Sequence, residues 1–128
     1  MKKLSFILVM GLAILSSCSK DKKRAMELEG TWLEVKVDQT VIPDAYADKI
    51  IFGPCKNKEN KDCDCTIQDG GSTYSTDFRY EIDGKGETLI LKYSVGFLTS
   101  NSSSTITAYS GDAMTIQWSN YTGEYKRE

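Results

Sequence analysis

The strictest pattern in the chain is an alternation of side chains over residues 74–93, interrupted once by a turn. Apolar, aromatic or Thr side chains occupy every second position from Tyr74 to Ile82, and polar or charged side chains fill the positions between them. Residues 83–86, Asp-Gly-Lys-Gly, have the composition of a hairpin turn, and the alternation resumes over 88–93. A two-residue period gives a β-strand one buried face. The segment therefore predicts two antiparallel strands packed on a core.

Shorter segments of the same kind predict further strands. Alternation, or a short apolar run bounded by turn-forming residues, occurs over 30–37, 49–52, 66–68, 104–110, 114–118 and 121–127. No long helical period is present, and about eight short strands joined by short connections favour an all-β, antiparallel, up-and-down barrel. The barrel domain is expected over 28–128, with loops at 38–46, 55–64 and 94–103.

The start of the chain has the layout of a secretory signal. Lys2 and Lys3 precede an apolar run of twelve residues from Leu4 to Leu15. A membrane-spanning helix needs about 20 apolar residues, so this run is too short to cross a bilayer and is typical of a signal peptide. The segment Leu15-Ser16-Ser17-Cys18 resembles the lipobox of bacterial lipoproteins, in which one apolar and two small residues precede a cysteine.

The lipobox resemblance implies a lipid anchor. Cleavage between Ser17 and Cys18 would remove residues 1–17 as a lipoprotein signal peptide. A diacylglycerol would join the Cys18 sulfur, and an acyl chain such as palmitate would cap the new amine. A signal peptide without lipidation is the alternative interpretation. Residues 18–27 would then form the lipidated cysteine and a polar, flexible tether, with the option of a helical turn near residue 24.

The anchor places the protein in the cell envelope, attached to a membrane through Cys18. Ser19 follows the cysteine in place of the aspartate associated with inner-membrane retention, so the outer membrane is preferred, on either its periplasmic or its surface face. The basic cluster within residues 20–24 is interpreted as part of a solvated linker, and attraction to anionic headgroups is the alternative.

Composition argues against several classes of function. Without residues 1–17 the chain has 14 basic and 18 acidic side chains, a net charge of −4, and no basic groove with interleaved aromatics, so no nucleic-acid partner is expected. The chain has no histidine, which removes Ser-His and Cys-His nucleophile pairs and the commonest metal ligand. We therefore expect no enzyme activity, no cofactor and no metal.

Two short motifs resemble the lipocalin, or calycin, pattern. Gly30-x-Trp32 opens the first strand, whose alternation places Trp32, Glu34 and Lys36 on one face, and Glu124-Tyr125-Lys126-Arg127 ends the last strand. The resemblance is to the short lipocalin-like domains of Bacteroidetes lipoproteins and covers residues 28–127. It implies that Trp32 packs at the closed base of the barrel and that Arg127, or alternatively Lys126, lies across it.

The interior of such a barrel has two possible uses, because eight strands enclose space either for their own side chains or for one small ligand. The side chains proposed to point inward are Trp32, Tyr74, Phe78, Tyr80, Leu89, Leu91, Ile106, Met114, Ile116, Trp118 and Tyr125. They either form a solid core or leave an open mouth. In the second case Tyr74, Phe78, Tyr80 and Trp118 would line a site for a small apolar or amphipathic molecule.

These uses correspond to two hypotheses about function. The leading hypothesis is a membrane-anchored, non-enzymatic lipoprotein that binds a small apolar or amphipathic ligand. The alternative is an accessory lipoprotein with a filled barrel and no ligand cavity. In that case loops 57–64 and 94–103 would contact an envelope protein partner.

Three cysteines remain once Cys18 is assigned to lipid. Outside the cytoplasm thiols tend to pair, so Cys55 is expected to form a disulfide with Cys63 or Cys65, and the remaining thiol would be free or intermolecular. A three-thiolate zinc or copper site is the alternative. The lipocalin-like resemblance also implies a cysteine pair in this region.

Overall fold

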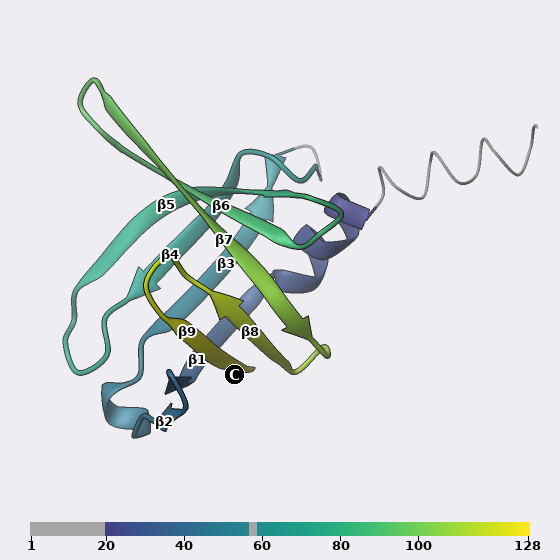
Figure 1. The fold of residues 1–128 in the computed structure, drawn as a ribbon. Helices are drawn as coiled ribbons and strands as arrows, with labels where there is room; N and C mark the ends of the chain where they lie inside the picture. Colours follow the sequence, from purple (N-terminus) through teal and green to yellow (C-terminus); the bar gives the residue numbers. More distant parts are fainter. Residues whose placement is uncertain (1–19, 57–58) are drawn as a thin grey trace, which may run out of the picture.

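The structure is a computed structural model that describes residues 20–56 and 59–128. The predicted signal peptide, residues 1–17, and the predicted lipidation site, Cys18, lie outside these ranges. Within them the chain forms one antiparallel sheet that curls into a barrel, with a helix at one end and a long hairpin projecting from the other (Figure 1).

The described part of the chain contains nine strands. They are β1 (Gly30–Val37), β2 (Thr40–Val41), β3 (Lys49–Cys55), β4 (Cys63–Gln68), β5 (Ser75–Asp83), β6 (Thr88–Val95), β7 (Leu98–Tyr109), β8 (Ala113–Gln117) and β9 (Thr122–Arg127). Their order in the sheet is β2-β1-β3-β4-β5-β6-β7-β8-β9, and β1 also pairs with β9. That pairing closes eight strands into an up-and-down barrel, with β2 as an extra strand on β1. The predicted fold class is confirmed.

Two connections between strands hold more structure than predicted. Residues 38–46 contain β2 and the 3₁₀ turn η1 (Asp44–Tyr46). The predicted loop at 94–103 is wrong, because β6 and β7 continue through it to the pair Val95↔Leu98. Gly96 has a φ of 60°, which opens a two-residue hairpin turn. Backbone pairing holds this hairpin together. Because most of its side chains are polar, the sequence shows no alternation of apolar and polar residues there.

The predicted flexible tether is also wrong where it can be compared with the structure. Residues 20–28 are helical and pack across one end of the barrel. Ala25 and Leu28, three residues apart, lie on one face of this helix and are fully buried in the barrel core. A helix this short is marginal in isolation, so its stability comes from such tertiary packing and not from intrinsic helix propensity. We call residues 20–28 the covering helix.

The covered half of the barrel is filled. Eight of the side chains predicted to point inward are buried in the barrel core: Trp32, Tyr80, Leu89, Leu91, Ile106, Met114, Ile116 and Tyr125. Phe78 and Trp118 are half-buried and pack against this core. Tyr74 is 80% exposed, so its inward prediction is wrong. It precedes the start of β5, where the barrel wall has already ended.

The described chain is a closed unit. Each of the eight barrel strands pairs with two other barrel strands of the same chain, and the covering helix packs on their shared core. We therefore expect the segment from residue 20 onward to fold on its own, and the experiments below use it.

Candidate functional site

The end of the barrel under the covering helix, here called the closed end, is built around Trp32 and Arg127. The two residues are paired across β1 and β9, and the Arg127 guanidinium carbon lies 4.3 Å from the centroid of the Trp32 ring. Lys126, the alternative partner, is exposed. The contact that the resemblance implies is therefore present, with Arg127 as the cation.

Hydrogen bonds to backbone carbonyls hold this contact in place. Arg127 Nη1 donates to the Glu29 carbonyl at 2.8 Å, and Arg127 Nε donates to the Gly111 carbonyl at 3.0 Å. Trp32 Nε1 donates to the Leu28 carbonyl at 2.9 Å. Each carbonyl belongs to the end of the covering helix or to a turn. The Trp32 and Arg127 side chains therefore connect β1 and β9 to these segments.

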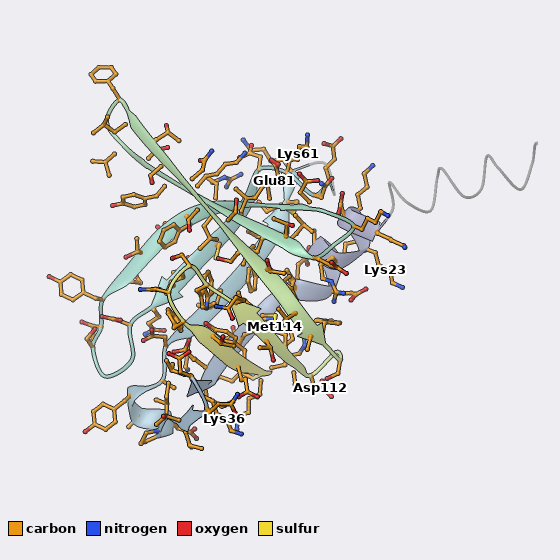
Figure 2. All side chains as sticks on the ribbon, in the orientation of Figure 1. Lys23, Lys36, Lys61, Glu81, Asp112 and Met114 are labelled. Carbon is orange, nitrogen blue, oxygen red and sulfur yellow. A yellow bond between two sulfur atoms is a disulfide. The ribbon has the colours of Figure 1, made fainter. Side chains whose placement is uncertain are left out.

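The covering helix is tied to the turn between β5 and β6. The Gly86 backbone N–H donates to Asp21 Oδ1 at 2.7 Å, and Arg24 Nε donates to the Gly86 carbonyl at 3.1 Å. The Arg24 guanidinium carbon also lies 4.1 Å from the centroid of the Tyr109 ring. Figure 2 shows Lys23 of the helix and Asp112 of the β7–β8 turn at this same end of the molecule. These contacts fix the covering helix to the barrel.

The cysteines complete the closed end. Cys55 and Cys63 form a disulfide between the end of β3 and the start of β4, which resolves the predicted pairing. Cys65 is free and buried, and burial raises the pKa of its thiol to about 12. With two of the three sulfurs joined to each other, the alternative of a three-thiolate metal site is wrong.

The opposite end, here called the mouth, is hollow. It contains a cavity of about 420 Å³ that opens to solvent. Apolar and aromatic side chains form most of its wall: Ile50, Ile67, Phe78, Leu91, Tyr93, Trp118, Tyr121 and Tyr125. Its polar lining consists of Glu34, Asp48, Ser100, Ser102, Ser119 and Asn120. We call this space the mouth cavity.

A chain of hydrogen bonds runs along one wall of the mouth cavity. Trp118 Nε1 donates to the Tyr125 hydroxyl at 2.8 Å, and the Tyr125 hydroxyl donates to Glu34 Oε2 at 2.7 Å. The Trp118 and Tyr125 rings meet edge to face, with centroids 6.5 Å apart. Glu34 ends this chain as a carboxyl group that is only 4% exposed.

Burial shapes the electrostatics of this wall. Desolvation raises the pKa of Glu34 above that of a free glutamate; the hydrogen bond from Tyr125 opposes the rise, and the nearby Asp48 carboxyl adds to it. Burial also raises the pKa of Tyr125 and of Tyr121, and the Glu34 carboxylate adds to both shifts. The mouth cavity therefore holds acidic groups that resist losing their protons.

The structure brings together two of the four residues predicted to bind ligand. Phe78 and Trp118 line the mouth cavity. Tyr80 does not, because it lies in the filled half, where its hydroxyl donates to the Gly53 carbonyl at 3.1 Å and its ring packs edge to face on Phe52. Tyr74 stands outside on the β4–β5 turn. The predictions for Tyr80 and Tyr74 as ligand contacts are wrong.

Sequence reasoning missed the most distinctive residue of the site. Glu34 shares its face of β1 with Trp32, so the predicted inward position of Trp32 already implied an inward carboxyl group. A β-bulge between Glu34 and Lys36 then breaks the alternation, and bulges are common where a strand re-aims a side chain beside a site. The alternation of β1 therefore indicated an inward Glu34, but a charged side chain is usually expected to face solvent.

The β6–β7 hairpin carries a separate surface feature. Phe97 at its tip is fully exposed, and Val95 and Leu98 beside it are mostly exposed. The hairpin projects beyond the barrel wall on the mouth side (Figure 1). Of the other loop predicted to contact a partner, residues 57 and 58 lie outside the described ranges.

Comparisons with known proteins add no identity. No protein-family model, curated protein or solved structure matches the chain. Across residues 20–56 and 59–128, no helix is both long and apolar enough to cross a bilayer.

Proposed function

We propose that this chain is a membrane-anchored, lipocalin-like lipoprotein that binds a small apolar or amphipathic molecule in the mouth cavity, without catalysing a reaction. The observation that carries the proposal is the hollow mouth above a filled base. A volume of about 420 Å³ falls within the range of roughly 300–1,000 Å³ typical of ligand pockets. A mostly apolar wall with a few polar groups is also typical of such pockets.

Small side chains on β7 support a cavity that is built into the fold. Ser100 and Ser102 face the mouth cavity from β7, and Ser102 pairs with Leu91 of β6, which also lines it. On the same strand, nearer the closed end, Ile106 fills the core. Serine at the two mouth positions leaves space that a larger apolar side chain would occupy.

The place of the covering helix supports the anchoring part of the proposal. Cys18 is two residues before Lys20, and a chain spans at most about 3.6 Å per residue, so a lipid on Cys18 would lie close to the closed end. Lys20, Lys22 and Lys23 are exposed on the helix at that end and carry charge suited to anionic headgroups. The mouth would then face away from the membrane that holds the anchor. We propose that this is the outer membrane of the envelope.

Native mass spectrometry of the segment from residue 20 onward, purified without detergent, tests the binding proposal. We expect a small lipid-like molecule to co-purify, or decan-1-ol to bind when added. Ser102→Phe should abolish binding because its ring occupies the cavity. Ser103→Phe is the matched control, since Ser103 is exposed on the opposite face of the same strand. Binding that survives Ser102→Phe, or no binding by the unmodified protein, would contradict the proposal.

A second candidate function, docking to an envelope protein, is favoured by one observation. The fully exposed Phe97 and its apolar neighbours Val95 and Leu98 form a small apolar tip on the hairpin. A photo-crosslinking residue at position 97, in the full chain in living cells, tests this candidate. One discrete adduct at position 97, absent when the probe is at Asp112, would favour docking over ligand binding.

A further inference from the structure

We propose that the mouth cavity selects an organic cation: an amphipathic amine whose ammonium group is bound by Glu34 and whose apolar body fills the space above it. This inference rests on the proposed function and specifies its ligand. Three observations support it: the charges that line the cavity, the free acceptor oxygen of Glu34 that faces it, and the aromatic wall.

The charges lining the mouth cavity all have one sign. Glu34 and Asp48 contribute two carboxyl groups, and among the described residues no Lys or Arg lines the cavity. The Asp48 carboxylate is held in place by the Gly70 backbone N–H, which donates to Oδ1 at 2.7 Å. A carboxylate ligand such as a fatty acid would enter a site with two acids and no counter-charge, which costs binding energy.

The hydrogen-bond chain of Trp118, Tyr125 and Glu34 ends in a free acceptor, and neither of its donors is left free. The Trp118 N–H is used by Tyr125, and the Tyr125 O–H is used by Glu34 Oε2. Glu34 Oε1 receives no hydrogen bond from any described residue. It is not among the fully buried atoms that lack a partner, so it keeps contact with the open cavity that Glu34 lines. An oxygen that faces the cavity can accept a hydrogen bond from a bound molecule. A ligand that supplies an N–H group would satisfy it, and a charged N–H group would do so most strongly.

The aromatic wall suits the same ligand. Phe78, Tyr93, Trp118, Tyr121 and Tyr125 surround the cavity, and faces of aromatic rings attract cations, most strongly for Trp. Trp118 packs against both Tyr121 and Tyr125, with centroids 6.2 and 6.5 Å away. Ile50, Ile67 and Leu91 supply aliphatic surface for an apolar body. A head that is a cation and a body that is a hydrocarbon both find matching surfaces.

The protonation of Glu34 gives this recognition a pH dependence. Ion pairing requires an ionised Glu34, and burial raises the pKa of this group. Asp48, Tyr93, Tyr121 and Tyr125 also line the cavity. The Asp48 carboxyl group carries the same sign of charge as Glu34, and burial raises the pKa of the Tyr121 and Tyr125 hydroxyls. Amine affinity should therefore rise with pH through the Glu34 pKa and then level off, whereas the affinity for a neutral alcohol of the same length should stay constant.

The test compares three probes with the same ten-carbon chain, each below its micelle concentration: decylamine, decan-1-ol and decanoic acid. Binding to the segment from residue 20 onward is followed by tryptophan emission at neutral pH. Only two tryptophans are present, and only Trp118 lines the cavity, so Trp118→Phe serves as the blank. We expect decylamine to bind about tenfold or more tightly than decan-1-ol, and decanoic acid to bind weakest.

The variant Glu34→Gln isolates the charge. Its carbonyl still accepts from Tyr125, so the wall keeps its shape while the negative charge is lost. We expect a loss of about tenfold or more in decylamine affinity and no change for decan-1-ol. Asp112→Asn removes one negative charge at the closed end, where Asp112 is exposed (Figure 2), and should change neither affinity.

The outcomes separate the two proposals. Equal binding of decylamine and decan-1-ol, unaffected by Glu34→Gln, would overturn the cation selection and leave the ligand-binding function standing. Tighter binding of decanoic acid than of decylamine would also overturn it. Failure of all three probes and the absence of any co-purified molecule would overturn the proposed function and this inference together.

Discussion

The closed end and the mouth of the barrel are made by the same eight strands, yet one is filled and the other is hollow. On β1 the inward side chain changes from Trp32 at the closed end to Glu34 beside the mouth cavity, and on β7 it changes from Ile106 to Ser102. One inward step along β1 thus replaces bulk by charge, and two inward steps along β7, past the buried Ser104, replace bulk by a small hydroxyl at the cavity. The cavity therefore comes from specific inward residues and not from the barrel architecture.

The polar atoms of the two ends differ in the same way. At the closed end, the Trp32 indole and the Arg127 guanidinium donate to backbone carbonyls of the chain itself. At the mouth, the donors lead instead to Glu34, whose second oxygen has no partner among the described residues. The Trp32 and Arg127 donors of the closed end are therefore engaged within the chain, whereas Glu34 keeps a free acceptor oxygen beside the mouth cavity.

The largest expected effect separates the two tryptophans. Trp32→Ala should lower the free energy of unfolding by about 3–5 kcal/mol, because it leaves a large cavity in a filled core and removes the surface under Arg127. Trp118→Ala should cost clearly less, since Trp118 is half-buried beside an existing cavity. Urea unfolding followed by circular dichroism measures both. Equal losses would mean that the two ends are packed alike.

The disulfide gives the next largest effect, and it is confined to the closed end. Cys55 and Cys63 are eight residues apart in sequence, and chain-entropy arguments give about 2–3 kcal/mol for closing a loop of this size. The double variant with Cys55→Ser and Cys63→Ser should lose about that much stability in urea. Its affinity for decan-1-ol should stay unchanged, because the mouth cavity lies at the other end. A parallel loss of ligand affinity would show that the two ends are coupled.

Much of this comparison could be predicted from the sequence. The two-residue alternation over 74–93 and the short turns are local signals, and they were enough for an antiparallel barrel. The resemblance carried by Gly30-x-Trp32 placed Trp32 at the closed end with Arg127 across it, and it left Lys126 as the alternative that the structure rules out. These predictions succeeded because each depends on a local signal, either the periodicity of a short segment or a motif of a few consecutive residues.

The parts that could not be predicted depend on contacts between distant residues. The covering helix shows only Ala25 and Leu28 to the core, too few for a helical pattern. The hairpin through 94–103 is held by backbone pairing of polar residues. Inward serines and an inward Glu34 look the same in sequence as solvent-facing ones, so the mouth cavity was expected only as one of two alternatives.

The third prediction uses pH to sharpen the contrast at Glu34. Burial raises the pKa of this carboxyl group in the folded state, so folding favours its neutral form. Its stabilising contribution is fully present below the unfolded-state pKa and is lost as pH rises through the folded-state pKa. Glu34→Gln should therefore be more stable than the unmodified protein at neutral pH, by about 1 kcal/mol, and the gain should vanish in acid. Thermal melts at several pH values, with Asp112→Asn as the control, would detect a constant difference if burial had no such effect.

The smallest expected effect concerns the hairpin tip, which belongs to neither a filled nor a hollow region. Phe97 is fully exposed, and exposed side chains without partners usually change stability by less than about 0.5 kcal/mol when replaced. Phe97→Ser should therefore leave the urea midpoint and the decan-1-ol affinity unchanged, while reducing the exposed apolar area at the mouth side. If Phe97→Ser instead weakened decan-1-ol binding as Ser102→Phe is expected to do, the hairpin tip would close over the bound molecule, and the mouth cavity would extend beyond the barrel wall.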